Sequence, residues 1–153
     1  MKYWLIKSEP SEFSIEDLSL RKNQTVEWFG VRNYQARNFM RNDMQIGDKA
    51  FFWHSSCKNP GIYGIVEVVS LAHPDSSQFD IDSDYYDPKS QKNDPRWWCV
   101  DVKLLSKTKY VPITALRANP KLAEMRVLQR GNRLSITPIT SHEWEIINLL
   151  LLK

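Results

Sequence analysis

The sequence has few cysteines, few glycines and no long apolar run. Cys57 and Cys99 are separated by 42 positions and form no CxxC pair, which predicts reduced thiols rather than a disulfide framework. The five glycines form neither GxGxxG nor GxxxxGK[ST], so no nucleotide cofactor is indicated. The apolar run from Ile146 to Leu152 is far shorter than the roughly 20 residues that cross a bilayer. No segment has the order of a signal peptide. We therefore expect a soluble cytoplasmic protein, nuclear if eukaryotic, with no cofactor and no membrane partner.

Metal-binding and catalytic patterns are also absent. His54-x-x-Cys57 is half of a zinc motif, and His73 and His142 are isolated, so no metal site is predicted. A catalytic base needs a partner residue, and no sequence pattern indicates such a partner for His54. We expect a protein that is not an enzyme and has no catalytic residues.

Length and composition are those of an ordinary globular domain. The chain has 153 residues, of which 42% are hydrophobic and 25% charged. Chains of this length usually form one domain with one core. We expect a single domain over residues 1–153.

Strand patterns outnumber helical ones. Segments rich in β-branched and aromatic residues, bounded by Gly, Pro, Asp or Asn, predict strands at 3–7, 50–54, 62–70, 97–105 and 134–139. Helical spacing predicts helices at 33–44 and 141–151, the latter opened by a capping box of Thr140 and Glu143, and Pro112 indicates a short helix through Leu116. The implied class is α+β, a curved or barrel-like mixed sheet flanked by helices.

Tryptophan is unusually dense, with six residues in the chain. If 97–105 is a strand, Trp98 shares a face with Val100 and Val102, whereas Trp97 shares the other face with Cys99. This alternation predicts Trp98 in the core and Trp97 at a surface or pocket. Any single Trp is more often a core residue, but that interpretation is weaker for all six together.

Charge is distributed unevenly along the chain. Residues 103–133 carry eight basic side chains and one acid, Glu124. Residues 73–96, by contrast, are acidic and rich in Ser and Pro, and this composition indicates a long surface loop over 73–96.

A glycine turn at Gly30 leads to a helix start with Arg32 and Asn33. Helix starts and Arg bind phosphate, but a solvated polar face explains this spacing equally well.

Several of these segments together resemble the EVE domain family. The motifs are YWLIKSEP at 3–10, WFGVRNYQARNF at 28–39, GD at 47–48, FWHS at 52–55, YYDPK at 85–89, PRW at 95–97 and RLS at 133–135. They follow in order along nearly the whole chain. The resemblance implies a PUA-like fold, a small mixed β-barrel flanked by helices that is related to the YTH readers of methylated adenine, and a function in binding modified bases of DNA or RNA.

The resemblance also implies a set of ligand-binding residues around an aromatic cage. Lys7 and Ser8 correspond to the strand end that faces the ligand, and Trp28 to a cage wall. The rest of the expected set comprises Glu9, Arg32, Asn33, Trp53, His54, Ser55, Tyr85, Tyr86, Trp97 and Arg133. Among these, Arg32 and Asn33 are expected at the rim, His54 and Ser55 in the polar lining, Tyr85, Tyr86 or Trp97 on the opposing wall, and Arg133 on phosphate.

Physical chemistry supports such a cage without any covalent step. Stacking contributes about 1–3 kcal/mol per base, and hydrogen bonds to the base edge add selectivity. Two other hypotheses stay open from sequence. One is an enzyme that acts on modified nucleic acid, with His54 and either Glu9 or Asp101 as acid–base groups, and the other is a small-molecule binder that uses the same cage.

Overall fold

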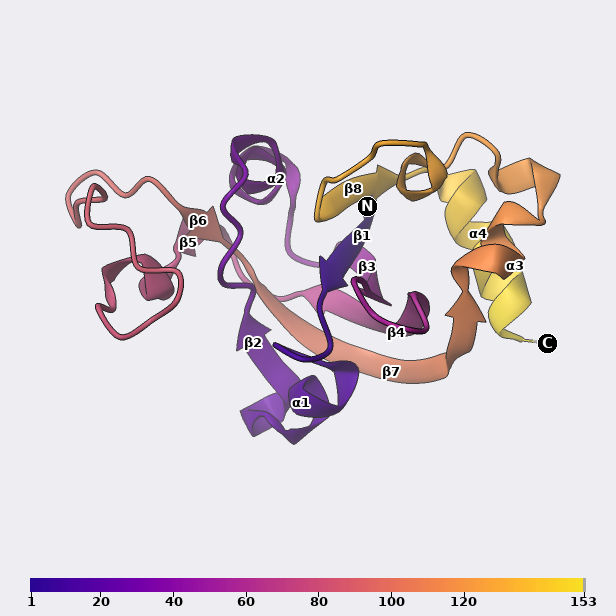
Figure 1. The fold of residues 1–153 in the computed structure, drawn as a ribbon, viewed down its shortest axis with the longest axis horizontal. Coiled ribbons are helices and arrows are strands. Elements are labelled where there is room, and N and C mark those ends of the chain that lie inside the picture. Colours follow the sequence, from indigo (N-terminus) through magenta and orange to yellow (C-terminus); the bar gives the residue numbers. More distant parts are fainter. Residues whose placement is uncertain (153) are drawn as a thin grey trace.

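Six strands form a strongly curved mixed sheet in the computed structural model, which describes residues 1–152 (Figure 1). The strands are β1 (Tyr3–Ser8), β2 (Thr25–Glu27), β3 (Lys49–His54), β4 (Gly61–Val68), β7 (Asp101–Pro112) and β8 (Ile136–Ile139). Their order across the sheet is β2-β7-β4-β3-β1-β8. Only β1 and β3 pair in parallel within this sheet of described residues; the other pairs are antiparallel.

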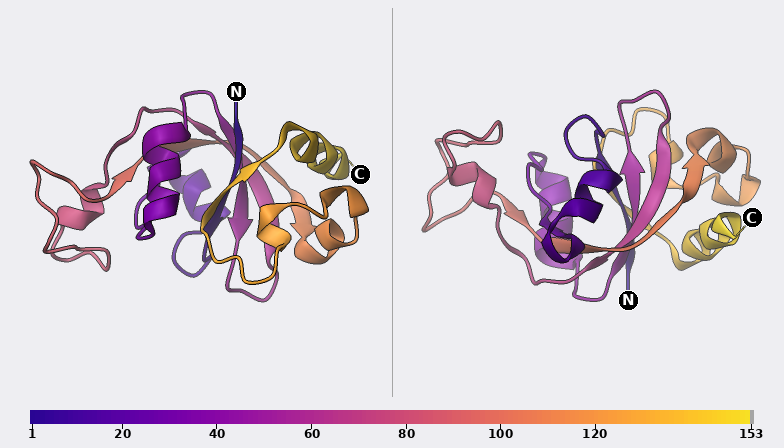
Figure 2. Two further views of the ribbon diagram at one scale, coloured as in Figure 1. Left: turned by 90° about the horizontal axis from the view of Figure 1, so that it is seen from above. Right: turned by 90° about the horizontal axis from the view of Figure 1, so that it is seen from below.

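Four helices flank this sheet. They are α1 (Ile15–Leu20), α2 (Tyr34–Asn38), α3 (Ile113–Arg117) and α4 (Ser141–Leu151). Helices α3 and α4 lie together at one end of the molecule, whereas α1 and α2 lie nearer the other end (Figure 2). The predicted α+β class, a curved mixed sheet flanked by helices, is confirmed.

Helix starts follow local capping chemistry. Thr140 and Glu143 form the predicted capping box of α4, which satisfies backbone N–H groups that have no partner inside the helix. Asn33 is the N-cap of α2, and its side chain accepts a hydrogen bond from Ala36 N. The predicted helix over 33–44 is realised in two parts, because α2 ends at Asn38 and a π-helical turn follows over Phe39–Asp43.

Both faces of the sheet are buried. Neighbouring residues of a strand point to opposite sides, so β1 sends Trp4 and Ile6 into one hydrophobic cluster and Leu5 into another. On β3, Phe52 joins the first cluster and Phe51 the second. The sheet therefore forms the central layer of the molecule. Because both of its faces are covered, only the ends of its strands are available to line a binding site.

A second, smaller sheet projects from the end of the main sheet near β2 and β7. It pairs β5 (His73–Pro74) with β6 (Trp98–Cys99). Between them, residues 75–97 form the predicted acidic surface loop, which begins with a 3-10 turn over Ser76–Phe79. This loop, hereafter the acidic loop, occupies the left end of Figure 1.

The two adjacent tryptophans correct the predicted alternation. Trp97 is buried beneath Tyr34, with ring centroids 4.9 Å apart, whereas Trp98 is only partly buried, with the Arg41 guanidinium 5.5 Å from its ring. Trp97 precedes β6, so strand alternation does not reach it. Val100 and Val102 are buried as predicted.

Strand β2 and helix α1 are not among the predicted elements. Helix α1 has a capping box of Ser14 and Asp17, but its six residues are too few to show a clear helical periodicity in the sequence. Among residues 1–152, every helix is too short or too polar to cross a membrane.

Candidate functional site

An open pocket of about 470 Å³ lies where strand β1 ends. This volume is in the range of small-ligand sites, roughly 300–1,000 Å³. Its walls come from the end of β1 and the turn after it, the segment after β2, the turn after β3, the acidic loop and the segment before β8. The lining residues are Lys7, Ser8, Glu9, Glu12, Phe13, Trp28, Phe29, Gly30, Val31, Arg32, Ser55, Ser56, Tyr85, Asn132, Arg133 and Ser135.

Aromatic side chains form one part of this pocket. Trp28 is buried and held edge-to-face by Phe13 and Phe52, at centroid distances of 6.3 and 5.5 Å. Phe29 is partly exposed and meets the Tyr85 ring at 5.9 Å. The packing of Trp28 leaves it little rotational freedom, so this wall is preorganised.

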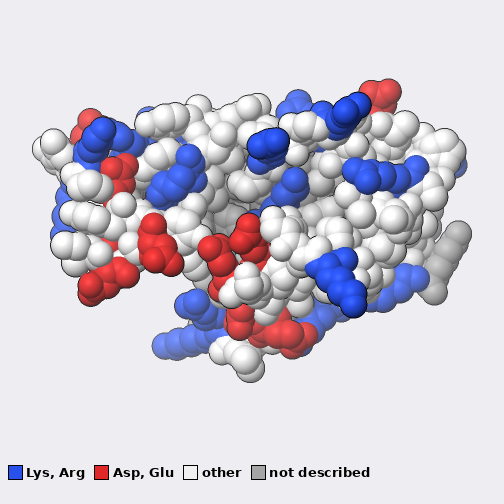
Figure 3. Space-filling view, viewed as in Figure 1, with Lys and Arg blue, Asp and Glu red and all other residues white. Residues whose placement is uncertain are grey.

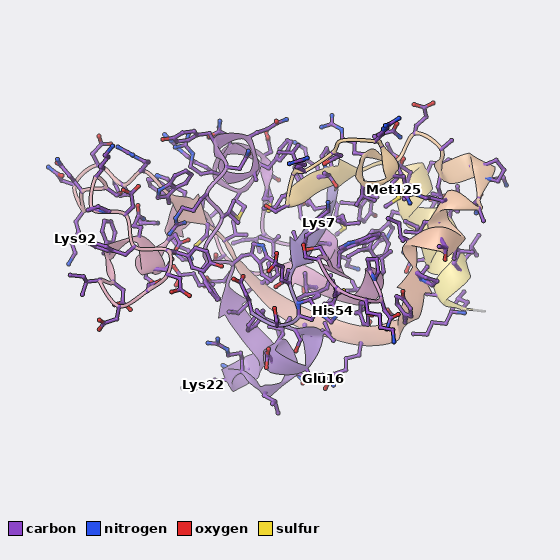
Figure 4. All side chains as sticks on the ribbon, viewed as in Figure 1. Lys7, Glu16, Lys22, His54, Lys92 and Met125 are labelled. Carbon is purple, nitrogen blue, oxygen red and sulfur yellow. The ribbon has the colours of Figure 1, made fainter. Side chains whose placement is uncertain are left out.

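Lys7 gives the pocket a positive charge on its β1 side. Burial lowers the pKa of its ammonium below the ordinary value of 10.5. The four ion pairs found within residues 1–152 do not include it. Figure 4 shows Lys7 in the middle of the molecule, far from Lys92 of the acidic loop. A half-buried ammonium without a carboxylate partner is well suited to donate hydrogen bonds to a ligand.

Tyr85 closes the opposite side of the pocket. Its O–H donates to Glu12 Oε2 at 2.9 Å, and burial together with this bond raises the pKa of Tyr85 to about 12. Its ring also lies against Gly30, whose φ is +84°: a Cβ at that position would stand 2.8 Å from ring carbons. Glycine is required there both for the backbone conformation and for the approach of the ring.

Arg32 connects this rim to the acidic loop. Its guanidinium donates to Asp75 Oδ2 at 3.1 Å, Ser77 Oγ at 3.1 Å and the carbonyl of Tyr85 at 2.7 Å. It also lies 5.2 Å from the Trp97 ring centroid. With a further bond to the carbonyl of Val31 at 3.0 Å, the guanidinium makes four hydrogen bonds inside the protein, which makes Arg32 a support of the rim as well as part of its lining.

Eight of the predicted ligand-binding residues line this pocket. They are Lys7, Ser8, Glu9, Trp28, Arg32, Ser55, Tyr85 and Arg133. The Ser8 hydroxyl donates to the carbonyl of Phe13 at 2.6 Å, which ties the end of β1 to the turn that follows it.

The other five predicted residues lie outside the pocket lining. Asn33 caps α2, and Trp53 is buried in the cluster on the other side of the sheet. Trp97 donates from Nε1 to Asp87 Oδ2 at 2.8 Å, and Tyr86 is exposed on the acidic loop. The fifth, His54, accepts a hydrogen bond from Ile15 N at Nε2.

This bond gives His54 a structural partner. The N···N distance is 3.1 Å, and the ring stacks on Tyr63 at a centroid distance of 3.9 Å. Burial lowers the pKa of His54 below 6.5. The bond to the start of α1 requires an unprotonated Nε2, so the neutral imidazole is the form that fits the fold.

Phe13, Phe29, Glu12 and Asn132 also line the pocket, although they are outside the predicted set. Phe13 precedes Ser14, the N-cap of α1, and shares a hydrophobic cluster with Leu18. This placement is that of a hydrophobic staple. The Ser14-x-x-Asp17 box was the available signal, because it indicates a helix start and an apolar residue folded back before it.

The curved six-stranded sheet with flanking helices and a pocket at the end of its first strand defines a PUA-like fold. The chain belongs to the EVE domain family, whose sequence model matches residues 2–150. The family resemblance of the sequence motifs is therefore confirmed.

Named relatives cover nearly all of the chain. Thymocyte nuclear protein 1 of Gallus gallus is 44% identical over 163 residues, which include 95% of this chain and 66% of the relative. The protein of the same name from Mus musculus is 42% identical, with 95% and 71% covered. The chain thus spans about two thirds of the length of these relatives.

One similar solved structure is that of human THYN1 protein in complex with DNA that contains 5-methylcytosine. It superposes on this chain with a TM-score of 0.93 at 40% identity and covers 100% of this chain and 99% of that one.

Proposed function

We propose that this chain is a non-enzymatic reader of a modified base in nucleic acid, with 5-methylcytosine in DNA as the first candidate. The observation that carries the proposal is a preorganised pocket that combines a fixed Trp28 wall with the unpaired ammonium of Lys7. A known structure supports the proposal: human THYN1 protein, which has the same fold, was solved in complex with DNA that contains 5-methylcytosine.

The pocket chemistry is complementary to a flipped-out cytosine. A base must leave the stack to enter such a pocket, and aromatic contacts contribute about 1–3 kcal/mol toward that cost. Cytosine offers acceptors at O2 and N3 beside an N4 amino donor. Lys7 supplies a donor, Glu9 supplies a carboxylate that can accept from an amino group, and Phe13 and Phe29 supply apolar surface for a 5-methyl group.

Residues at the pocket mouth fit contact with the sugar–phosphate backbone. Arg133 is exposed and lines the pocket next to Asn132, at the end of the basic stretch. On the face shown in Figure 3, acidic groups gather in the lower middle and at the left, whereas the right half carries mainly basic groups. We propose that phosphate follows the basic side, because phosphate contacts position a protein while base contacts specify the sequence.

The placement of His54 supports binding rather than catalysis. Its Nε2 is used by the backbone of Ile15, and it does not line the pocket. An acid–base role would require His54 to reach the ligand. The enzyme hypothesis therefore has no geometric support at this residue.

The proposal is tested with matched oligonucleotides that differ only in cytosine or 5-methylcytosine at one position, with binding followed by tryptophan fluorescence at low salt. We expect tighter binding of the methylated strand and loss of affinity in Lys7→Met. Removal of one hydrogen bond from a charged group is worth about 1.5–3 kcal/mol, which corresponds to a roughly 10- to 150-fold weaker Kd.

Lys22→Met is the matched control. Lys22 is exposed and lies outside the pocket lining, so its loss should change the preference for methylated DNA little. If neither strand binds at low salt, or if Lys7→Met binds as the unchanged protein does, the pocket is not the reading site. Oligonucleotides with RNA or with methylated adenine extend the comparison to the other modified bases.

A further inference from the structure

Four polar side chains gather behind the pocket wall, where the small sheet meets the main sheet. Glu27 of β2 is the register partner of Asp101 of β7, and His73 of β5 is the register partner of Cys99 of β6. The two cross-strand pairs bring together residues that lie far apart in the sequence, with no metal-ligand spacing among them. We refer to them as the four-residue cluster.

Three members of the four-residue cluster lie at distances close to those between ligands of one ion, and the fourth, Asp101, contacts His73. Potential ligand atoms of Glu27, His73 and Cys99 lie within 4.8 Å of one another. Cys99 Sγ is 3.5 Å from Glu27 Oε1 and 4.0 Å from His73 Nε2, and His73 Nε2 is 2.8 Å from Asp101 Oδ1.

The surroundings orient these side chains. Both ring nitrogens of His73 face acceptors: Nδ1 lies 3.0 Å from the carbonyl of Pro74 and Nε2 lies 2.8 Å from Asp101 Oδ1, so an ion that binds one nitrogen leaves the other to donate to its acceptor. Metal-bound histidines commonly use their second ring nitrogen in this way. The Glu27 carboxylate accepts from both the N–H and the hydroxyl of Ser76, each at 2.6 Å, so its direction is also fixed.

We propose that Glu27, His73 and Cys99 bind a divalent transition-metal ion, with Asp101 as the hydrogen-bond partner that orients His73 and with Zn²⁺ as the best match. Thiolate and imidazole select a borderline-soft ion over Ca²⁺ or Mg²⁺, and three protein ligands with water in the fourth position suit tetrahedral Zn²⁺. Zn–S bonds of about 2.3 Å and Zn–N bonds of about 2.0–2.1 Å place bound sulfur and nitrogen atoms roughly 3.5 Å apart, so the 3.9 Å between Cys99 Sγ and His73 Nδ1 must shorten only slightly. Movement of side chains alone can supply this.

A bound cation would also balance the charge of the cluster. The Glu27 carboxylate lies 3.5 Å from Cys99 Sγ, and the Asp101 carboxylate lies 2.8 Å from His73 Nε2, so two acidic groups stand close together here. A cation at ligand distance would offset their repulsion and stabilise the Cys99 thiolate.

The position of the ion suggests a structural role that does not depend on what the pocket binds. Glu27 immediately precedes Trp28, and His73 lies two residues before Asp75, which holds the pocket rim. An ion at the cluster would fasten the small sheet and the base of the acidic loop to the main sheet. It would act as a clamp behind the pocket wall, outside the pocket lining.

The test is titration of chelator-treated full chain with Co²⁺ alone, followed by competition with Zn²⁺. We expect a thiolate-to-cobalt charge-transfer band that saturates at one equivalent and is displaced by Zn²⁺. Cys99→Ser should abolish the band, whereas Cys57→Ser, which removes the other free thiol, should keep it. Absence of a saturable band, or an unchanged band in Cys99→Ser, would overturn the proposal.

Because Cys99 is buried, a second variant separates lost binding from misfolding: Asp101→Asn, at a more exposed position that contacts His73. We expect it to bind Co²⁺ about 10- to 100-fold more weakly while its far-ultraviolet circular dichroism stays unchanged. We also expect added Zn²⁺ to raise the Tm of the unchanged protein and of Cys57→Ser. Equal Co²⁺ affinity in Asp101→Asn would show that Asp101 does not orient His73 and would overturn this arrangement of the site.

Discussion

At the scale of single residues, Asp75 connects the acidic loop to the pocket. It is 1% exposed, and its carboxylate accepts from Gly30 N at 2.8 Å and from Arg32 at 3.1 Å. It also accepts from the N–H and hydroxyl of Ser77, at 2.9 and 2.6 Å. A buried carboxylate is tolerated only when its oxygens are satisfied in this way.

Asp75→Asn should therefore destabilise the protein markedly. The amide presents one acceptor oxygen instead of two and leaves Arg32 without its counter-charge, and breaking such a pair costs about 3–5 kcal/mol when both partners are buried. Arg32 is 23% exposed, so we expect about 3 kcal/mol in the free energy of unfolding, measured by urea denaturation. Asp94→Asn, at an exposed position of the same loop, is the control, and a loss below about 1 kcal/mol in Asp75→Asn would contradict the role given to Asp75.

His54 should make stability depend on pH in the acidic range. Burial lowers the pKa of folded His54 below the 6.5 of the unfolded chain. As the pH falls below about 6.5, the unfolded chain takes up this proton first, so the free energy of unfolding decreases until the folded pKa is passed. Above pH 6.5 the neutral His54 makes its full contribution to the free energy of unfolding.

Comparison with His54→Gln isolates this effect, because glutamine does not titrate and can still offer an acceptor to Ile15 N. The difference in unfolding free energy between the two proteins, measured from about pH 5 to pH 8, should grow in favour of the unchanged protein as the pH rises. His142→Gln, which makes the same substitution at an exposed position, is the matched control variant. A difference that stays constant across this range would show that His54 does not titrate as described.

At the scale of elements, the start of α2 separates two interpretations of Asn33. The sequence resemblance places Asn33 at the pocket rim, whereas the structure shows its side chain capping α2 through Ala36 N at 3.0 Å. A cap and a ligand contact respond differently to substitution, because serine can replace asparagine in the first role.

We expect Asn33→Ser to keep stability within a few tenths of a kcal/mol and to keep affinity for the oligonucleotides. Asn33→Ala should lower the free energy of unfolding by about 1 kcal/mol. Thermal and urea unfolding measure the first effect, and the fluorescence titration measures the second. Loss of affinity in Asn33→Ser with stability retained would restore Asn33 to the ligand-binding set.

Elements with strong local signals were predictable from sequence. The capping box of Thr140 and Glu143 marked the start of α4, and Pro112 marked the start of α3. The three-residue strand β2 carries too short a pattern to be recognised, and it exists because it pairs with β7. Trp97 was misplaced because alternation applies only inside a strand.

The same reasoning explains which site residues the sequence could suggest. Lys7 and Trp28 belong to long motifs, and both line the pocket. Trp53 belongs to a motif too, but the strand direction turns it to the other side of the sheet. The four-residue cluster could not be predicted, because strand register alone brings Glu27 beside Asp101 and His73 beside Cys99.

At the scale of the whole molecule, a net charge of +3 is a small average over opposed regions. The acidic loop projects from one end, while the basic stretch of residues 103–133 runs through β7 and α3 to the pocket mouth. Binding of a polyanion should therefore depend on where the basic residues lie rather than on their number.

Arg133→Met should reduce the salt dependence of oligonucleotide binding. If Arg133 contacts one phosphate, the slope of log Kd against log salt concentration should fall by about 1 in magnitude. Arg117→Met, which removes an exposed arginine of α3 outside the pocket lining, is the control. Equal slopes for the unchanged protein and Arg133→Met, measured from roughly 50 to 200 mM salt, would place the phosphate elsewhere.

Strand β1 carries the pocket's Lys7 and sits between β3 and β8. Its pairs with β8 join Ile6 to Ile136 and Tyr3 to Ile139, so the strand that carries Lys7 pairs with a strand more than a hundred positions later in the chain. Contacts of such long sequence separation slow folding. During synthesis the pocket therefore stays incomplete until β8 has emerged, and a nascent chain cannot hold a ligand in it before then.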